Sequence, residues 1–424
     1  VYYRRPGSGG DTVTLLDVTT TIGTGKVAAG GTWSITTASP LAVGAHRLTA
    51  READAADNKS PNSPVQSLTV MSGTPNAILF FGTPGSDNFT GGPGDDVFRF
   101  SQPDLANSDI VRGGAGIDEL FMTSPGTVQA GGISAVETYR LANGGANTLT
   151  LSDTNFSGVI GAAITIDGGN AGNTVDGHTL TGTHRIVAVG GAGTDVFIGG
   201  SGNDIFKFSA ANLASTDTVN GGGGSNELML TTFGTIAEGG VSGIETYELS
   251  KGGNTLILAT GNFTGVTGKV ITVDGDSGGN TISEAGVAAA DRVVINGGSG
   301  ADTLIAGQNA AMTGGVGADR FELSMPGSTT TPDNIRITDF VHGTDKVSFS
   351  EAGFDLGPTP VAATLFKANP TGSFTTAAQR FAYDTTNGRL FYGAHGDAHG
   401  SSRLLIATLS DQPNLTVADI AFAA

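Results

Sequence analysis

The feature that constrains this chain most is an internal duplication with a spacing of 108 residues. The stretch GGPGDDVFRF at 91–100 recurs as GGSGNDIFKF at 199–208. The match continues downstream, where GGISAVETYRL at 131–141 corresponds to GGVSGIETYEL at 239–249. A third, shortened copy begins with GGSGADTLIAG at 297–307. Repeats of this kind build a solenoid or a string of similar domains, because each copy packs against its neighbour.

A finer pattern lies inside each copy, in which a glycine-rich tract ends in Asp or Asn and a large apolar residue follows two positions later. The Asp and Asn residues are Asp87, Asp96, Asp118, Asn147, Asn173, Asp195, Asp204, Asn226, Asn254, Asn280, Asp302 and Asp319. Most steps between them run from 17 to 29 residues, about one coil of a β-solenoid. We therefore expect one such residue at a corner of each coil. Hairpin turns are the alternative, but they would not keep this spacing.

The apolar residues of the pattern are expected to point into the interior of the solenoid. They are Phe89, Phe98, Leu120, Leu149, Val175, Phe197, Phe206, Leu228, Leu256, Ile282, Leu304 and Phe321.

The composition favours an all-β protein and restricts the classes of partner that the chain can bind. The chain has 68 Gly residues without a collagen period, and turn residues interrupt it every few positions. Its net charge of −18 disfavours nucleic acid and anionic lipid and favours cations. It has no Cys, which excludes disulfides and thiolate metal sites, and no apolar run long enough for a transmembrane helix. The start, VYYRRPGSGG, is not a secretion signal, so we expect either a fragment or an export signal elsewhere in the chain.

Eight segments fit the pattern G-G-x-G-x-D-x-U-x, where U is a large apolar residue. They begin at Gly82, Gly91, Gly113, Gly190, Gly199, Gly221, Gly297 and Gly314, with Thr83 and Asn226 as departures from the pattern. These segments resemble the RTX, or hemolysin-type calcium-binding, nonapeptide repeat. The resemblance implies a parallel β-roll that holds calcium between stacked turns. The residues suit that ion, because calcium takes six to eight oxygen ligands from carboxylates and carbonyls.

The resemblance also implies which residues ligate calcium. The acidic or amide candidates are Asp87, Asp96, Asp118, Asp195, Asp204, Asn226, Asp302 and Asp319. The carbonyl candidates are Gly92, Gly94, Gly114, Gly116, Gly191, Gly193, Gly200, Gly202, Gly222, Gly224, Gly298, Gly300, Gly315 and Gly317. For each Asp the alternative is an ordinary turn residue exposed to water.

Three pairs of tracts are expected to stack and clamp an ion, namely those that begin at Gly91 and Gly113, at Gly199 and Gly221, and at Gly297 and Gly314. The degenerate tracts around Asn147, Asn173, Asn254 and Asn280 are expected to form metal-free corners whose amides bond from coil to coil.

The two ends of the chain read differently. Residues 1–71, with GTWSITT at 31–37 and LAVGAHRLTA at 41–50, are similar to bacterial Ig-like modules. Asp54 and Asp57 are candidate calcium ligands there, against a solvated turn as the alternative. Residues 333–350 resemble the segment that closes RTX rolls, where Asp339 and Asp345 either ligate a last calcium or cap turns.

The sequence FAYDTTNGRLFYGAHGDAHGSSRLLIATL at 381–409 resembles the C-terminal domain of type I secretion substrates. Within it, His395 and His399 lie four residues apart in a glycine-rich loop. No third ligand accompanies them in that loop, so we do not expect a zinc site.

We therefore expect an all-β protein with an Ig-like sandwich at 1–71 and β-solenoid modules at 72–189 and 190–296. A short β-roll with its closing segment should occupy 297–350, and a secretion domain 351–424. The expected function is that of a secreted, calcium-binding adhesin or S-layer-like component that folds outside the cell. Its partners would be calcium ions and the type I secretion machinery, with self-association or a cell-surface glycan as further candidates, and neither nucleic acid nor transmembrane insertion.

An active site is not expected within these residues. Neither H-E-x-x-H nor G-x-S-x-G occurs. The pairs Glu137/Tyr139 and Glu245/Tyr247 recur at equivalent places, which favours a structural role. The alternative function is that of a secretion and folding region of a larger extracellular protease, lipase or polysaccharide-modifying enzyme.

Overall fold

The structure is a computed structural model, and it describes residues 10–28, 33–37, 39–42, 44–70, 77–236, 239–323, 334–350, 354, 363–393 and 403–423. The chain divides into two compact units. The first unit contains residues 1–142 and 154–164, and the second contains residues 143–153 and 165–424.

The first unit begins with a four-stranded antiparallel sheet. Its strands β1 (Thr12–Asp17), β2 (Thr20–Lys26), β3 (Gly44–Ala53) and β4 (Gln66–Val70) lie in the order β2-β1-β3-β4. The alternation expected of a half-buried strand is visible in β1, where Val13 and Leu15 are buried between more exposed neighbours. One sheet of antiparallel strands is therefore what the described residues of this segment form.

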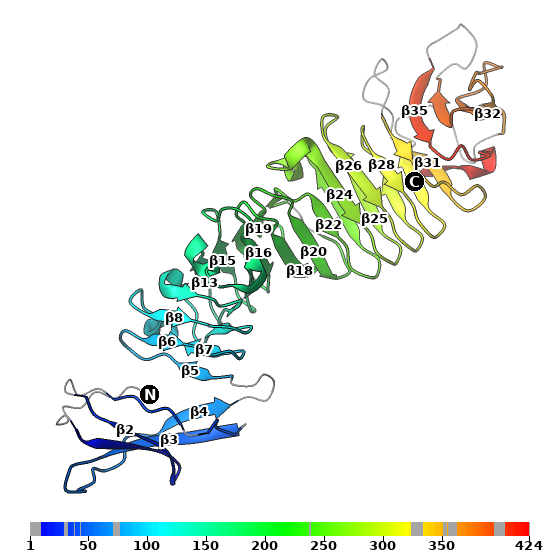
Figure 1. The fold of residues 1–424 in the computed structure, drawn as a ribbon. Coiled ribbons are helices and arrows are strands. Elements are labelled where there is room, and N and C mark those ends of the chain that lie inside the picture. Colours follow the sequence, from blue (N-terminus) through cyan, green and yellow to red (C-terminus); the bar gives the residue numbers. More distant parts are fainter. Residues whose placement is uncertain are drawn as a thin grey trace. The chain divides into compact units, whose positions relative to one another are not determined.

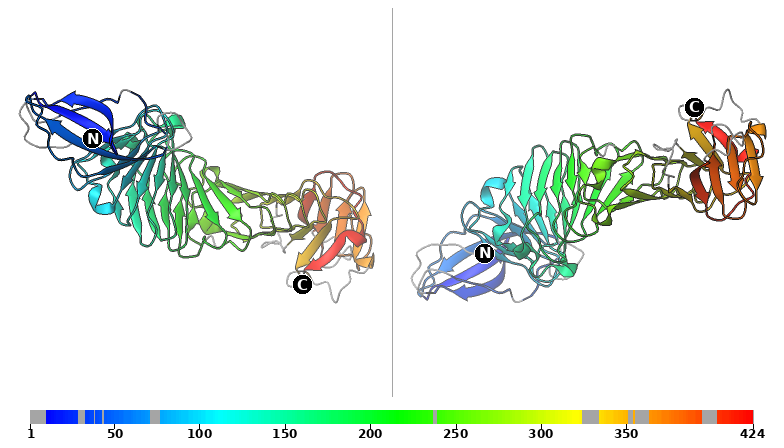
Figure 2. Two further views of the ribbon diagram at one scale, coloured as in Figure 1. Left: turned by 90° about the horizontal axis from the view of Figure 1, so that it is seen from below. Right: turned by 90° about the horizontal axis from the view of Figure 1, so that it is seen from above.

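The rest of the chain is dominated by a parallel β-solenoid of about 12 turns, and helix makes up only 7% of the protein. Figure 1 shows the strands of each unit stacked side by side along successive coils, and the two views in Figure 2 show the same stacking from other directions. The expected all-β class and parallel solenoid are confirmed, and the hairpin alternative is wrong for these tracts, because their strands pair in parallel.

The coils of the first unit contribute strands to two sheets. One sheet contains β5 (Leu79–Phe81), β7 (Val97–Phe100), β9 (Glu119–Met122) and β12 (Thr138–Arg140). The other contains β6 (Asn88–Thr90), β8 (Ile110–Arg112) and β11 (Ile133–Ser134). The register places Val97 beside Glu119, so the tracts that begin at Gly91 and Gly113 stack as expected. Strand β10 (Thr127–Val128) lies between β9 and β11 in the chain, and β14 (Ala163–Asp167) comes after β12.

The second unit continues the same architecture over more coils. One sheet contains β16 (Arg185–Val189), β18 (Ile205–Ser209), β20 (Glu227–Thr232), β22 (Thr246–Glu248), β24 (Val270–Asp274), β26 (Arg292–Asn296), β28 (Ala311–Thr313) and β30 (Arg336–Ile337). Opposite strands are β13 (Asn147–Thr150), β15 (Asn173–Asp176), β17 (Val196–Ile198), β19 (Thr218–Asn220) and β21 (Val241–Ser242). These are followed by β23 (Thr255–Ala259), β25 (Thr281–Gly286), β27 (Thr303–Ile305), β29 (Arg320–Leu323) and β31 (Lys346–Ser350).

The interior of the coils is filled by the apolar residues that follow the Asp and Asn corners. Eleven of the twelve residues expected there are fully buried, and Phe89 is half-buried. Rings stack along the axis, as between Phe80 and Phe98 with centroids 4.8 Å apart. The core therefore arises from one inward residue per corner, repeated along the coil.

The C-terminal residues add strands to both sheets of the last coil in the second unit. Strand β35 (Leu404–Leu409) pairs in parallel with β30, and β36 (Ile420–Ala423) pairs in parallel with β31. Strands β32 (Phe366–Asn369), β33 (Phe381–Asp384) and β34 (Arg389–Tyr392) complete this part. The final coil therefore has neighbours for the backbone N–H and C=O groups of β30 and β31, and β36 becomes the last strand of its sheet.

The described helices are all short 3₁₀ segments, and none of them is long and apolar enough to span a membrane. They are η1 (Gln102–Asp104), η2 (Ala130–Gly132), η3 (Asp153–Phe156), η4 (Ile160–Ala162), η5 (Thr260–Phe263), η6 (Thr267–Lys269), η7 (Ala363–Leu365) and η8 (Val417–Asp419).

Candidate metal centres at the coil corners

The Asp and Asn residues of successive corners form ladders of hydrogen bonds. In each rung, the backbone N–H of one corner residue donates to the side-chain Oδ1 of the corresponding residue one coil later. Asp96 donates in this way to Asp118 at 2.7 Å, and Asp302 donates to Asp319 at 2.9 Å. The further rungs of this kind are Asn173 to Asp195, Asp204 to Asn226, Asn254 to Asn280, Asn280 to Asp302 and Asp319 to Asp345. Each corner carboxylate or amide is therefore part of the solenoid backbone's own hydrogen bonding.

Some members of these ladders were not expected from the sequence. Asp109 accepts from the backbone N–H of Asp87, and Asp217 accepts from that of Asp195, both at 2.8 Å. Glu137 accepts from the N–H of Asp118 through Oε2 at 2.9 Å, and Glu245 accepts from Asn226 at 2.7 Å. None of these four residues occupies the Asp position of a G-G-x-G-x-D tract, but Asp109 and Asp217, like Glu137 and Glu245, keep the 108-residue spacing of the duplication. The repetition of these residues at that spacing is the feature of the sequence that could have identified them as ladder members.

The glycines allow the backbones of neighbouring corners to approach closely. A Cβ on Gly116 would meet the carbonyl oxygen of Gly94. A Cβ on Gly224 would meet that of Gly202, and a Cβ on Gly317 would meet that of Gly300. Coil-to-coil stacking is therefore sufficient to require glycine at these positions.

Eight of the candidate glycines have positive φ values that favour glycine, namely Gly114, Gly116, Gly193, Gly222, Gly224, Gly298, Gly300 and Gly315. The second glycine of the tract also bonds to the next coil through its carbonyl oxygen. The oxygens of Gly92, Gly200 and Gly298 accept backbone N–H groups at distances from 2.8 to 2.9 Å.

The corners occupied by Asn place an amide donor against carbonyl oxygens. Asn226 donates through Nδ2 to the carbonyl oxygen of Gly243 at 2.9 Å. Asn280 does the same to Gly297 at 3.1 Å and also donates to its own turn. The amides of Asn147 and Asn254 bond to the corner residue of the next coil, as expected for these degenerate tracts. An Asn corner thus supplies its own donor for the carbonyl oxygens around it.

At three corners the residue is Asp, so a carboxylate oxygen, which can only accept, takes the place of the Asn amide N–H₂, which donates. The Oδ2 atoms of Asp118, Asp302 and Asp319 are buried and have no hydrogen-bond partner among the described residues. At the Asp302 corner, this oxygen and the carbonyl oxygen of Gly314 both lie 2.7 Å from where a Cβ on Gly297 would stand. The Asp118 corner is similar, because its Oδ2 and the carbonyl oxygen of Ala135 crowd the Cβ position of Gly113. At these corners a carboxylate oxygen and a carbonyl oxygen thus border the same small space, which is open only because the residue beside it is glycine.

The other Asp candidates are already bonded within their own turns. Oδ2 of Asp96 accepts the N–H of Gly92 at 2.6 Å, and Oδ2 of Asp204 accepts that of Gly200 at 2.8 Å. Asp195 accepts in the same way from Gly191 at 3.2 Å. Asp87 bonds to both the N–H and the hydroxyl of Thr83, so it caps a turn. Asn226 has both ends of its amide engaged in hydrogen bonds.

Burial makes the ionised form of these carboxyls unfavourable. Desolvation, together with the negative charges of Asp96 and Glu137, raises the pKa of Asp118 to about 6 against the hydrogen bond donated by the Asp96 N–H. Desolvation likewise raises the pKa of Asp302 to about 6 and raises that of Asp319. A carboxylate in this position requires either a proton or a cation.

The corner residues fit a hard cation such as calcium on two counts, the orphaned buried oxygens and the cradles that a Cβ would fill. Within the described ranges, no group of three or more His, Asp or Glu side chains is placed to hold a metal ion. An ion at a corner would therefore be held by one or two carboxylates together with backbone carbonyl oxygens.

The candidates at the two ends serve as turn caps. Asp54 accepts the N–H groups of Ala56 and Asn58, both at 2.9 Å. Asp57 lies in an exposed turn with its carboxylate 3.6 Å from Lys59.

Asp339 accepts the N–H groups of Gly314 and Gly315, and Asp345 accepts those of Asp319 and Val341. These hydrogen bonds match the turn-capping role that was the alternative to calcium ligation for Asp339 and Asp345. His395 and His399 lie outside the described residues.

Comparisons with protein-family models, with curated proteins and with solved structures found no match to this chain.

Proposed function

We propose that this chain is a secreted, RTX-like calcium-binding protein with a structural or adhesive role at the cell surface, whose solenoid is completed by calcium. The single observation that carries the proposal is the contrast between Asn and Asp corners. Where Asn280 points an amide N–H₂ at the carbonyl oxygen of Gly297, Asp302 points a buried oxygen toward that of Gly314. A cation placed between two such oxygens would replace the missing donor.

The residues that would hold calcium differ in part from those expected from the nonapeptide pattern. Oδ2 of Asp118 with the carbonyl of Ala135, and Oδ2 of Asp302 with the carbonyl of Gly314, are the best placed oxygens. Asp319 is the third carboxylate of this kind. Calcium at these corners would neutralise buried negative charge and tie neighbouring coils together.

Binding of this kind would couple calcium to folding. An ion that binds the folded solenoid and not the unfolded chain stabilises the fold in proportion to the logarithm of its concentration over Kd. The net charge of −18 would oppose compaction at low calcium and draw the ion at high calcium. Folding would thus be favoured outside the cell, where calcium modules typically bind with Kd of roughly 10⁻⁴–10⁻³ M.

The remaining parts of the proposal rest on sequence resemblance. The antiparallel sheet β2-β1-β3-β4 is compatible with one sheet of an Ig-like sandwich. The C-terminal strands that pair with β30 and β31 are assigned to a type I secretion domain, which would be recognised by the export machinery.

Far-UV circular dichroism and thermal melting of the full chain, in chelator and in millimolar calcium, test the proposal. We expect a large rise in melting temperature with calcium and little or none with the same concentration of magnesium, which dehydrates reluctantly and demands regular octahedral geometry. Identical spectra and melting curves in chelator and calcium would refute the proposal.

A further inference from the structure

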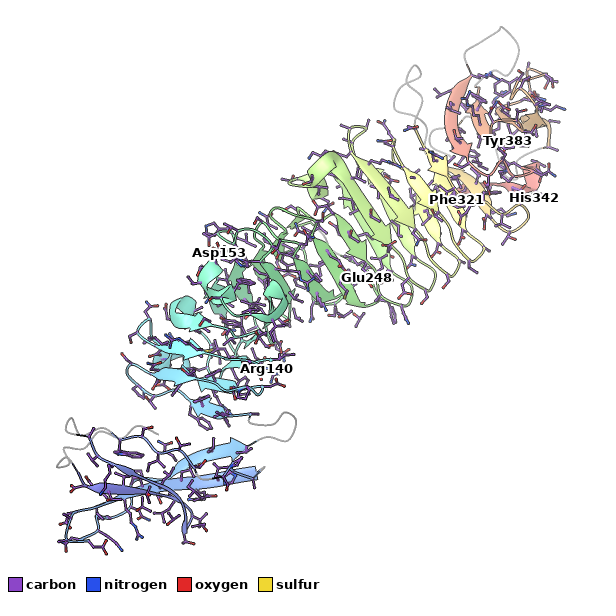
Figure 3. All side chains as sticks on the ribbon, in the orientation of Figure 1. Arg140, Asp153, Glu248, Phe321, His342 and Tyr383 are labelled. Atoms are coloured by element: carbon purple, nitrogen blue, oxygen red, sulfur yellow. The ribbon has the colours of Figure 1, made fainter. Side chains whose placement is uncertain are left out.

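The outward face of one sheet in the first unit carries a line of alternating aromatic and cationic side chains. Phe81 pairs with Arg99, Arg99 pairs with Phe121, and Phe121 pairs with Arg140 at one register across β5, β7, β9 and β12. We call these four residues the Phe/Arg row. Their neighbours Phe98, Leu120 and Tyr139 are fully buried, so the row lies on the opposite, solvent-facing side of the sheet. Figure 3 shows Arg140 among the side chains that project from the coil.

The row is an organised surface. The Arg99 guanidinium lies 4.9 Å from the centre of the Phe121 ring, and the Arg140 guanidinium lies 5.6 Å from it. Nε of Arg140 also lies 3.1 Å from Glu119. Packing on an aromatic face restricts a guanidinium without removing its charge. Phe81 keeps 41% of its surface exposed at the end of the row.

The same register in the second copy of the repeat has a different chemistry. There the row reads Val189, Lys207, Met229 and Glu248. The interior residues of the two copies remain alike, as Phe98 and Phe206 show. The Phe/Arg row is therefore not required by the fold, which both copies share.

We propose that the Phe/Arg row binds a linear acidic polysaccharide, a chain of hexuronic acid residues lying across the strands. The Arg99 guanidinium offers a fork of donors that fits a carboxylate, and Arg140 adds positive charge beside its ion pair with Glu119. Phe81, which is 41% exposed, offers a flat apolar face to the C–H face of a sugar ring. The two Arg residues are two strands apart, roughly 10 Å at the spacing of strands in a sheet. An extended polyuronate likewise presents carboxylates on one side from alternate residues.

Other classes of partner fit this surface less well. A peptide strand would add to a sheet edge through backbone hydrogen bonds and would not lie across four strands on a sheet face. Duplex nucleic acid and anionic membranes are wide anionic surfaces that would also meet the acidic residues behind the net charge of −18, whereas a single polyuronate chain along the row meets mainly its two Arg residues. The inference goes beyond the proposed function and does not rest on calcium at the corners.

Isothermal titration of oligogalacturonate into the full chain, with millimolar calcium throughout, tests the assignment. The double variant Arg99→Ala/Arg140→Ala should weaken binding about tenfold or more, because two charge-assisted contacts are lost. Phe121→Thr should also weaken it. The matched control is Lys207→Ala/Met229→Thr at the same register of the second copy, which should bind as the unchanged chain does.

Three further ligands distinguish recognition of the sugar from recognition of the charge. The methyl ester of the same oligosaccharide keeps the sugar and loses the charge, and it should bind at least about tenfold more weakly. Polyphosphate and phosphatidylglycerol vesicles keep the charge without the sugar and should compete at least about tenfold more weakly, because they offer no C–H ring face to Phe81. Absence of oligogalacturonate binding, retention of binding by the double variant with unchanged circular dichroism, or equal competition by polyphosphate or vesicles would each overturn the proposal. Calcium-dependent melting in the same samples reports separately on the corners.

Discussion

The backbone N–H of Asp302 donates to Oδ1 of Asp319 on the next coil at 2.9 Å, while Oδ2 of each carboxylate lies buried without a hydrogen-bond partner among the described residues. Oδ1 of each carboxylate thus accepts a hydrogen bond of the ladder, whereas Oδ2 accepts none from the described residues. An unsatisfied buried acceptor costs about 1–3 kcal/mol, and more when it is charged. The ladder explains why these residues are needed for the fold, and the second oxygen explains why they would take up a cation.

The substitution Asp302→Asn should convert this corner into one of the Asn280 type. The new amide can donate to the carbonyl oxygen of Gly314, so we expect the chain in chelator to gain about 1–3 kcal/mol in unfolding free energy. The stabilisation by calcium should fall at the same time. Urea unfolding in chelator and in calcium measures both, with Asp87→Asn as the control. A loss of stability in chelator with unchanged calcium response would contradict the account.

The reverse substitution, Asn226→Asp, should create a corner like that of Asp118, its counterpart in the first copy. The variant loses the donor that now bonds to Gly243 at 2.9 Å, so it should be less stable in chelator. In calcium it should recover that stability and bind additional calcium. Chelator titration with a calcium indicator dye counts the ions, and an unchanged count would go against the proposed geometry.

The stability of the chain in chelator should decrease as the pH rises from about 4 to about 6. Folding raises the pKa of Asp118 and of Asp302 from 3.8 to about 6, so the folded state holds protons that the unfolded state has already released. The stability that these protons contribute is complete below the unfolded pKa and is lost as the pH rises through the folded pKa. To check this, the melting temperature in chelator is measured at pH 4.5 and at pH 7.5 for the unchanged chain and for the Asp118→Asn/Asp302→Asn variant. The difference between the two chains should be more favourable to the unchanged chain at pH 4.5 than at pH 7.5. In calcium these two carboxyls should instead contribute more stability at pH 7.5 than at pH 4.5, because protons compete with the ion below about pH 6.

Glu284 supplies a separate pH dependence inside the solenoid. It is 1% exposed, and burial raises the pKa of its carboxyl from 4.5 to about 8, opposed by a hydrogen bond from the Gly307 N–H. The proton on this side chain stabilises the fold fully below pH 4.5, and this contribution is lost as the pH rises toward 8. Glu284→Gln should therefore be more stable than the unchanged chain at pH 9 and similar to it at pH 4. Equal stability of the two chains at both pH values would show that Glu284 is not buried in this way.

The close stacking of glycines should make Gly317→Ala strongly destabilising. Its Cβ would meet the carbonyl oxygen of Gly300, and overpacking of this kind costs typically about 1–3 kcal/mol. Gly261→Ala is the control, because a Cβ there meets nothing within 4 Å. Urea unfolding of both variants in calcium compares them, and a tolerated Gly317→Ala would show that the coils do not stack this closely.

The period of the sequence was enough to predict the coil and its interior. One apolar residue follows each corner, and that alternation decides which side chains are buried, as at Phe206 and Leu228. The stacking of the tracts that begin at Gly297 and Gly314 followed from the same spacing.

The ladder members outside glycine tracts could not be predicted with the same ease. Asp109 and Glu137 reach the corners from outside the G-G-x-G-x-D tracts, and their role depends on how the loops before them turn. Likewise the pattern indicated the glycines at the second and fourth positions of each tract as ligands. In the structure, the carbonyl oxygens that crowd the same glycine Cβ positions as the orphaned carboxylates of Asp118 and Asp302 come from Ala135 and Gly314. Positions of this kind are set by three-dimensional packing.

The most direct test of the central claim is isothermal titration of calcium into the full chain and into the triple variant Asp118→Asn/Asp302→Asn/Asp319→Asn. The account predicts calcium binding by the unchanged chain. It predicts that the triple variant loses the binding events of these three corners while remaining folded in chelator. No calcium binding by the unchanged chain, or an unaltered number of ions bound by the triple variant, would contradict it.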